Sequence, residues 1–316
     1  MDQKWDCQSE HFRLYVPQGG LQMNIPDSCA RCLYDKQTRR TDDAAYLAEV
    51  KAMLDSRSES DTSPLMVLRF NQAYERRFGK LQSYADVKKR FNDLALSMEA
   101  LVRDRIDSSP DPLAAALAYA RVGNYVDFGA LKDVSEEKFL ELLGSPELYE
   151  SDRKAYASFI AQCRHAGNFL LLADNCGEIV FDKLLLEQLG KRYPGMKLSV
   201  LVRGAEALND VTMDDAEYVG LDKVAHLITN GEPVAGTIYE RLPPEAKEAV
   251  DHADIILAKG QGNYESFAPS GKHAFYLLLC KCELFTGRFQ VPKLTGVFVE
   301  EDMSGKYGDG AILKGR

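Results

Sequence analysis

The hydrophobic positions of this chain change their spacing about halfway along it. In the first half, apolar residues recur every three or four positions, as they do on one face of an α-helix. These stripes predict helices over residues 41–54, 84–105 and 113–120, and a shorter helix that begins at Ser135. No strand pattern of any length occurs before about residue 167. The first half is therefore expected to be helical.

In the second half, short apolar runs alternate with helical patterns. Strands separated by helices are typical of βαβ units, which build a mostly parallel sheet with helices on both faces. The sequence thus predicts an α/β fold. The predicted strands are Phe169–Ala173, Lys197–Val202, His226–Thr229, Asp254–Ala258 and Thr295–Val299.

The length of the chain agrees with a division into two parts. A chain of 316 residues is long for one hydrophobic core and sufficient for two. The pattern changes between about residues 150 and 166. We therefore expect a mainly helical domain over residues 1–160 and an α/β domain over residues 161–316.

Composition and charge exclude several classes of protein. Hydrophobic residues make up 45% of the chain, as in an ordinary globular protein. The formal net charge of −9 argues against nucleic acid as the main partner. No secretory signal or membrane span is apparent, so a cytoplasmic location away from membranes is expected. The seven cysteines are an odd number and are expected to be reduced. The sequence carries no signal for an oligomeric state.

Polar residues directly follow three of the predicted strands. In a doubly wound sheet, these strand ends meet at one edge, where ligands bind. A tight turn at Gly177 lets Glu178 begin the helix after the first strand. The strand-end residues are Asp174 and Asn175 after the first strand, Arg203, Asn209 and Asp210 after the second, and Lys259, Gly260, Gly262 and Asn263 after the fourth.

These residue types suit phosphoryl chemistry. The oxygens of Asp174, Asn175 and Asp210 are the hard ligands that Mg²⁺ or Mn²⁺ prefers. Such an ion neutralises charge on a transferring phosphoryl group and activates water. Lys259 would bring a positive charge to phosphate, and the small Gly260 and Gly262 would let backbone N–H groups approach it.

Each loop taken alone also has a simpler interpretation. Asp174-Asn175 could form an Asx turn, Asn209-Asp210 could cap a helix, and Lys259 could be a solvated surface lysine. The occurrence of all three after buried strands favours a shared site.

The motifs together resemble a known family. Asp174-Asn-Cys-Gly-Glu178, Asn209-Asp-Val-Thr212 and Lys259-Gly-Gln-Gly-Asn-Tyr-Glu265 resemble motifs of the metal-dependent damage-control phosphatases, long catalogued as domain of unknown function 89. Cys29-Ala-Arg-Cys32 resembles the Cys-x-x-Cys of the prokaryotic branch. Further similarity lies in Gly123-Asn124-Tyr-Val-Asp127 and in Tyr276–Cys282, so that the resemblance extends over about residues 27–290.

The resemblance implies a helical domain packed on a Rossmann-like domain, and hydrolysis of small phosphorylated metabolites with Mn²⁺, Co²⁺, Ni²⁺ or Mg²⁺. It makes Asp174, Asn175 and Asp210 metal ligands and Lys259 a phosphate contact. These four form the expected catalytic set. The expected substrate-binding residues, the first two from the helical domain, are Asn124, Asp127, Glu178, Arg203, Gly260, Gly262 and Asn263. One departure is the absence of the family's proline before Asn209, where this chain has Ala205-Glu206-Ala207.

The sequence allows alternatives for the nucleophile, for two of the expected site residues and for the class of protein. In-line attack by water is the expected reaction, and direct attack by Asp174 is the variant, although Cys176 stands where an Asp-x-Asp motif would need a second Asp. Asn124 and Asp127 could instead cap helices. A non-catalytic metabolite-binding protein would use the same crevice. A Rossmann-type transferase or dehydrogenase would need a more glycine-rich first turn.

The cysteines allow more than one interpretation. Cys29 and Cys32 could be half of a zinc site, a redox pair, or two small residues at a helix start. Cys176 could be a reactive thiol with a lowered pKa, or could simply fill space beside the metal.

Overall fold

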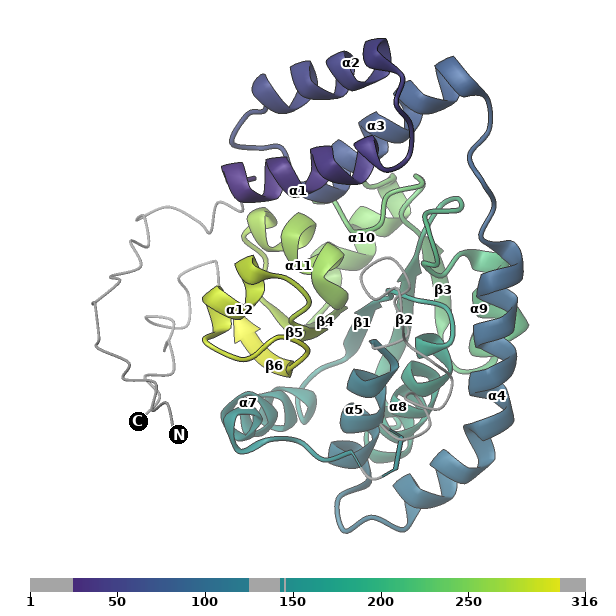
Figure 1. The fold of residues 1–316 in the computed structure, drawn as a ribbon. Helices are drawn as coiled ribbons and strands as arrows, with labels where there is room; N and C mark the ends of the chain where they lie inside the picture. The colour runs from purple at the N-terminus through teal and green to yellow at the C-terminus, as the bar shows by residue number, and fades with distance from the viewer. Residues whose placement is uncertain (1–24, 125–142, 145, 302–316) are drawn as a thin grey trace, which may run out of the picture.

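The computed structural model describes residues 25–124, 143–144 and 146–301 (Figure 1). Its centre is a six-stranded sheet of order β3-β2-β1-β4-β5-β6. Strands β1 to β5 run parallel, and β6 is antiparallel to β5. The fold class predicted from the sequence is confirmed. The strands are β1 (Asn168–Leu172), β2 (Lys197–Val202), β3 (His226–Thr229), β4 (Ile255–Lys259), β5 (Ala274–Leu279) and β6 (Gly296–Glu301).

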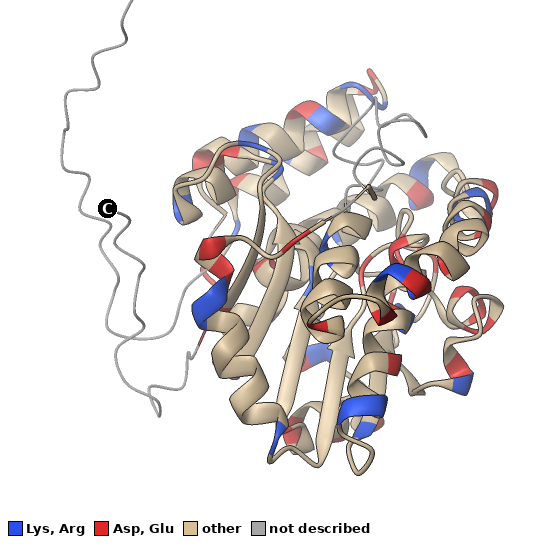
Figure 2. Cartoon of the chain, turned by 90° about the horizontal axis from the view of Figure 1, so that it is seen from below, with Lys and Arg blue, Asp and Glu red and all other residues tan. Residues whose placement is uncertain are grey.

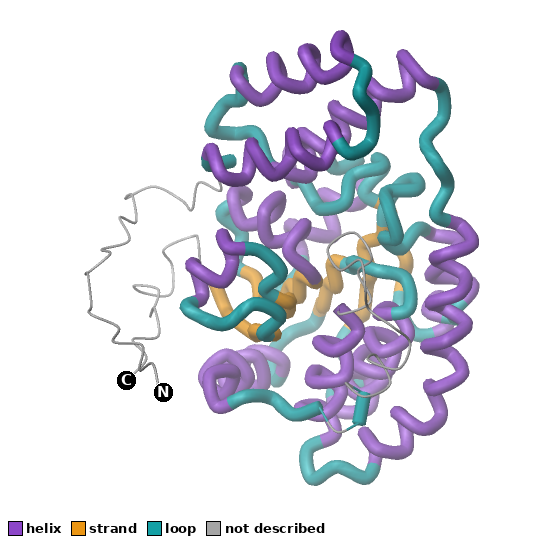
Figure 3. Tube along the Cα trace, in the orientation of Figure 1, coloured by secondary structure: helices purple, strands orange, loops and turns teal. Residues whose placement is uncertain are grey.

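The sheet is buried because helices cover both of its faces (Figure 3). Successive side chains of a strand point to opposite faces. Phe169 and Leu171 of β1 pack into one core, whereas Leu170 and Leu172 pack into another. Residues of α4, α5, α7, α8 and α9 line the first core, and residues of α10, α11 and α12 line the second.

The longest helices on the sheet, α4 and α8, lie on the first face. The bounds are α4 (Ala85–Asp107), α5 (Pro112–Gly123), α7 (Arg153–Cys163), α8 (Glu178–Arg192), α9 (Met213–Tyr218), α10 (Pro244–His252), α11 (Gly260–Phe267) and α12 (Glu283–Phe289). Single turns of 3₁₀-helix lie at Glu150–Asp152, Leu221–Lys223, Tyr239–Arg241 and Ala268–Ser270.

The first three helices form a separate packing unit. They are α1 (Asp27–Thr38), α2 (Ala44–Asp55) and α3 (Ser63–Phe78), and their core includes Tyr46 and Phe70. In Figure 1 they lie on the side of α10 and α11, and α3 packs against α11. Helices α4 and α5 instead pack against α8 on the opposite face of the sheet. The N-terminal helices are thus divided between the two faces.

Differences from the predicted elements have physical reasons. Strand β5 was not predicted, because its six residues are all buried and show no alternation to separate a strand from a core helix. Helices α1 and α3 were not predicted either. Most of the short helix expected at Ser135 lies outside the described residues, and Leu143, one of the residues it was expected to bury, is buried.

Charged residues lie mainly on the helices, and the strands are almost free of them (Figure 2). None of the described helices is long and apolar enough to cross a membrane. The cytoplasmic location stays a prediction.

Candidate active site

The candidate site lies where the strand order of the sheet reverses. Strand β1 is flanked by β2 on one side and β4 on the other, and ligands of α/β sheets bind at such switch points. The loops after β1 and β2 are joined there by backbone hydrogen bonds. Val211 N–H donates to Asp174 O at 2.9 Å, and Cys176 N–H donates to Asn209 O at 2.9 Å. The predicted strand-end motifs therefore lie side by side.

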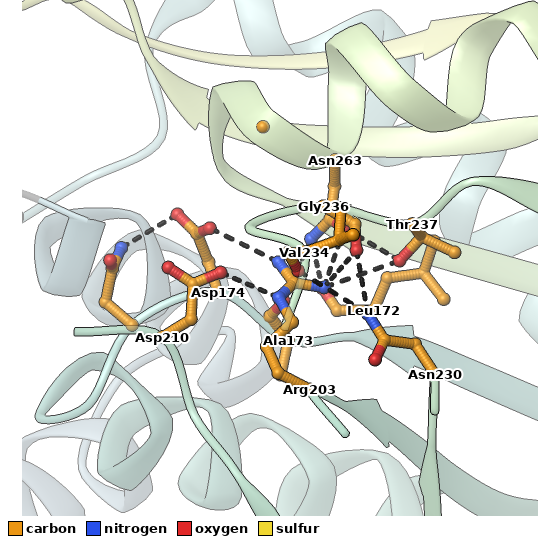
Figure 4. A network of polar contacts seen from close by, with 12 residues as sticks. Leu172, Ala173, Asp174, Arg203, Asp210, Asn230, Val234, Gly236, Thr237 and Asn263 are labelled. Carbon is orange, nitrogen blue, oxygen red and sulfur yellow. Dashed lines mark hydrogen bonds and ion pairs between the residues drawn. The ribbon is translucent and has the colours of Figure 1, made fainter. Parts of the chain in front are cut away.

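Two carboxylates and a guanidinium form the centre of the site. Asp174 and Asp210 are turned toward one another, with Arg203 beside them (Figure 4). Arg203 Nε donates to Asp210 Oδ2 at 2.7 Å, and Arg203 Nη2 lies 3.7 Å from Asp174 Oδ1. Within the described part of the chain, Nη2 has no hydrogen-bond partner although it is buried. This nitrogen can therefore donate a hydrogen bond to one more anionic oxygen.

Residues that lie far from Arg203 in the sequence fix the position of its side chain. Its Nη1 donates to Gly236 O at 2.9 Å and to Asn263 Oδ1 at 3.2 Å. Asn263 is in turn held by its amide nitrogen, which donates to the carbonyl oxygens of Ala173 and Lys259 at 2.9 and 2.7 Å. Asn263, expected to bind substrate, thus supports Arg203.

Two amides hold the opposite oxygen of Asp174. Asn124 Nδ2 and Asn175 Nδ2 donate to Asp174 Oδ2 at 2.8 and 2.7 Å. The same nitrogens donate to Glu178 Oε2 at 3.0 and 2.9 Å. The amide oxygen of Asn175 accepts from Asn209 Nδ2 at 2.9 Å. Asn124, expected on the substrate side, is fully buried and hydrogen-bonded to Asp174. Asp127 lies outside the described residues.

Lys259 lies behind this cluster rather than in front of it. Its Nζ is 2.5 Å from Glu178 Oε1, 2.5 Å from Asp182 Oδ1 and 3.0 Å from Ala120 O. Its side chain is fully buried. A contact between this ammonium and phosphate, as expected from the family resemblance, would require Lys259 to leave these partners.

The glycines of the site allow close packing. Gly260 has a φ of +76°, and a Cβ there would lie 1.9 Å from Asp174 Oδ2. A Cβ at Gly262 would lie 2.3 Å from Ala235 O. At Gly123, next to Asn124, a Cβ would lie 2.9 Å from Glu178 Cα. Only glycine lets the start of α11 approach Asp174, and the end of α5 approach Glu178 of α8, this closely.

The electrostatics of the site favour an added positive charge. Burial, together with the nearby carboxylates of Asp210 and Glu178, raises the pKa of Asp174 well above its usual range. The positive charges of Lys281 and Arg203 act in the opposite direction but do not cancel this effect. The interpretation of Cys176 as a low-pKa thiol is wrong, because burial raises its pKa.

The oxygen atoms of this cluster are of the kind that a divalent cation prefers. No three His, Cys, Asp or Glu side chains of the described residues gather closely enough to hold a metal ion. The donor set would therefore be two carboxylates, Asp174 and Asp210, completed by the Asn175 amide. After burial, the carboxylates of Asp210 and Glu178 are the next causes of the raised pKa of Asp174, and a cation would offset their charge. The residues fit the metal if Asn175 Oδ1, which accepts from Asn209 Nδ2, coordinates the ion instead while its Nδ2 stays on Asp174.

Three residues near the site were not among the predicted site residues. Asn209 and Lys281 belong to motifs read from the sequence, but neither was given a role. Asp182 lies four residues after Glu178, a spacing that places both carboxylates on one face of α8. That spacing was the available signal, and it was missed because Asp182 lies outside the motif.

Comparison with known proteins identifies the family. A family model described as the damage-control phosphatase ARMT1-like domain matches residues 24–296. The chain belongs to this family. A family relative from Archaeoglobus fulgidus, named damage-control phosphatase, is 32% identical over 273 residues, which cover 83% of this chain and 93% of that protein.

Two further matches come from Pyrococcus horikoshii. A protein named damage-control phosphatase is 31% identical over 182 residues, which cover 56% of this chain and 61% of that protein. The crystal structure of a DUF89 family protein superimposes with a TM-score of 0.71 at 24% identity, covering 87% of this chain and 98% of that one. The latter match shows that the family fold is shared.

Proposed function

We propose that this chain is a metal-dependent phosphatase that hydrolyses small phosphorylated metabolites, such as sugar phosphates or damaged cofactor phosphates. One observation carries the proposal. Asp174 and Asp210 face one another at the switch point of the sheet, beside a buried Arg203 nitrogen that has no hydrogen-bond partner among the described residues. Carboxylates for a cation and a guanidinium for a phosphate oxygen are the two parts that phosphoryl transfer requires.

Asp174, Asp210 and Asn175 would hold the metal. A bound Mn²⁺, Co²⁺, Ni²⁺ or Mg²⁺ would neutralise charge on the phosphoryl group and lower the pKa of water. Arg203 would bind a phosphate oxygen through Nη2, while its Nε and Nη1 stay with Asp210 and Gly236. The geometry thus supports one positioned cationic side chain at the substrate phosphate.

Water is the proposed nucleophile, rather than Asp174. Asp174 Oδ2 accepts hydrogen bonds from Asn124 and Asn175, and both withdraw electron density from the carboxylate. Its Oδ1 lies beside the Arg203 guanidinium. A carboxylate held in this way is a poor nucleophile and a good metal ligand.

We also propose that the chain belongs to the Cys-x-x-Cys branch of the family. Cys29 and Cys32 lie on α1, and Cys29 is half-buried whereas Cys32 is exposed. Burial and the nearby Glu265 raise the pKa of Cys29 to about 11. A thiol that stays protonated at neutral pH suits a structural role better than a redox pair.

The test is a screen of phosphomonoesters on protein freed of metal by a chelator, with Mn²⁺, Co²⁺, Ni²⁺ or Mg²⁺ added back. Release of inorganic phosphate that depends on an added cation supports the proposal. Metabolite binding without phosphate release, with every cation, would identify a binding protein instead. Transfer of phosphate to an acceptor other than water would identify a transferase.

A further inference from the structure

Lys259 has no hydrogen-bond donor left for a ligand. An ammonium group has three N–H donors, and oxygen atoms of Glu178, Asp182 and Ala120 lie within 3.0 Å of this Nζ. Burial lowers the pKa of Lys259, but the two carboxylates outweigh burial and raise it, so the group is charged. A charged lysine with all its donors used inside the protein is a part of the framework.

Glu178 connects this lysine to Asp174. Its Oε1 accepts from Lys259, and its Oε2 accepts from the amide nitrogens of Asn124 and Asn175. A carboxylate oxygen only accepts, so it forces each amide to turn its nitrogen, not its oxygen, in this direction. Because these nitrogens also donate to Asp174 Oδ2, Glu178 sets the orientation in which both amides contact Asp174.

Asp182 holds the other side of the lysine. It lies one helical turn after Glu178 on α8, is fully buried, and accepts from Lys259 through Oδ1. Its Oδ2 has no hydrogen-bond partner among the described residues. A buried carboxylate without a full set of partners is costly, and its presence points to a role for the ion pair.

We propose that Asp182 and Lys259 are positioning residues that fix the carboxylate of Glu178. Glu178 in turn keeps the amide nitrogens of Asn124 and Asn175 hydrogen-bonded to Oδ2 of Asp174. This leaves Oδ1 of Asp174 directed toward Arg203. The consequence for metal binding rests on the proposed function, whereas the effect on the amides does not. Lys259 acts in this arrangement without touching the substrate.

A double-mutant cycle tests the proposal. The variants are Lys259→Met, Glu178→Gln and the double variant, and the measurement is the Mn²⁺ dissociation constant by calorimetry. We expect each single substitution to weaken Mn²⁺ binding about tenfold and the double variant to be no weaker than the worse single one, because both act through one path. Multiplying effects would overturn the proposal.

Inorganic phosphate separates this role from direct substrate contact. At saturating Mn²⁺, Lys259→Met should change the affinity for inorganic phosphate less than twofold. A loss of about tenfold or more would mean that Lys259 contacts phosphate, as a hydrogen bond between charged groups is worth about that much. That result would overturn the positioning role even if the cycle were non-additive.

Lys183 provides the matched control. It is a second buried lysine, located on α8, and its Nζ contacts Glu99 at 2.9 Å and Val219 O at 2.7 Å. Lys183→Met should lower stability and leave Mn²⁺ binding unchanged. If it weakened Mn²⁺ binding as much as Lys259→Met, the effect would be a general loss of structure and the proposal would fail.

Two further measurements keep the proposal testable if Lys259→Met does not fold or if no Mn²⁺ binds. Asp182→Asn keeps the shape and should accelerate hydrogen exchange of the Asn124 and Asn175 side-chain amides in the metal-free protein several-fold. Unchanged exchange would overturn the proposal. A wild type that binds Mn²⁺ but hydrolyses no phosphomonoester would contradict the proposed function and leave this inference standing.

Discussion

Two buried cations lie on either side of β1, and their surroundings differ. Lys259, on β4, is enclosed by Glu178 and Asp182, which are both fully buried. Arg203, after β2, has one nitrogen without a hydrogen-bond partner among the described residues. It faces two carboxylates, Asp210 and Asp174, whose exposed fractions are 4% and 8%. The Lys259 group uses all the hydrogen-bonding capacity of its cation, whereas the Arg203 group does not.

The difference indicates which group serves the fold and which serves chemistry. Two carboxylates that face one another in a poorly solvated position repel each other, so their closeness lowers the stability of the fold. Such unfavourable arrangements of charge cluster at functional sites. We therefore expect changes around Arg203 to affect reaction and ligand binding, and changes around Lys259 to act indirectly.

The largest effect should come from Asp210→Asn. An amide oxygen can still accept from Arg203 Nε, so the fold should persist, but one of the two charges that would hold the cation is lost. We expect turnover of a phosphomonoester to fall by about a thousandfold, the upper range for one electrostatic group. Steady-state kinetics and a melting curve measure this. Turnover within tenfold of wild type would remove Asp210 from the site.

Gly260→Ala should have the next largest effect, because the added Cβ would overlap Asp174 Oδ2. We expect turnover to fall by about a hundredfold and stability to fall by about 1–2 kcal/mol, from the left-handed backbone alone. Gly271→Ala is the control. Its φ is +70° but its Cβ would meet nothing within 4 Å, so it should lose stability and keep its activity. Equal activity of the two variants would contradict the close approach.

Arg203→Lys should have a smaller effect, on substrate affinity. Lysine keeps the charge but cannot contact Asp210, Gly236 and phosphate at once, because it lacks the planar fork of arginine. We expect KM for the phosphomonoester to rise about tenfold, the value of one charged hydrogen bond. Lys191→Arg, an exposed change on α8, should leave KM unchanged. A KM equal to that of wild type in Arg203→Lys would leave Nη2 without a role.

The contrast between the two cations also shows what the sequence could predict. Periodicity placed β1, β2 and β4, and therefore brought Asp174, Asp210 and Lys259 to one edge of the sheet. The sequence could not show on which side of that edge the ammonium of Lys259 lies. That depends on Glu178 and Asp182 of α8 facing β4, which is a matter of tertiary packing.

Residues far apart along the chain were harder to predict. Asn124 lies 50 positions before Asp174 and contacts its carboxylate directly. The prediction placed it on the substrate side, because a sequence motif does not show where a helix end packs. Arg203 was predicted, but its support by Gly236 and Asn263 follows only from the fold of two further loops.

The smallest expected effect is a change in the melting temperature of the metal-free protein. The folded-state pKa of Asp174 is raised, so its stabilising contribution is present below the unfolded pKa of about 3.9 and is lost as the pH rises through the folded pKa. Above the unfolded pKa, the metal-free protein therefore bears a cost for burying this carboxyl, whether the carboxyl is ionised or kept protonated. Asp174→Asn removes it and should raise the melting temperature by about 2 °C or more, since about 1 kcal/mol corresponds to 2–4 °C.

The sign should reverse when metal is added, and this reversal separates function from packing. Wild-type protein at a Mn²⁺ concentration a hundred times the dissociation constant should gain about 2.7 kcal/mol, and Asp174→Asn should gain almost nothing. Calorimetric melting of both proteins at pH 5 and pH 8, with chelator and with Mn²⁺, measures these differences. Should Asp174→Asn melt below wild type at pH 8 in chelator, the Asp174 carboxylate would be a stabilising charge. The Arg203 group would then serve the fold, as the Lys259 group does.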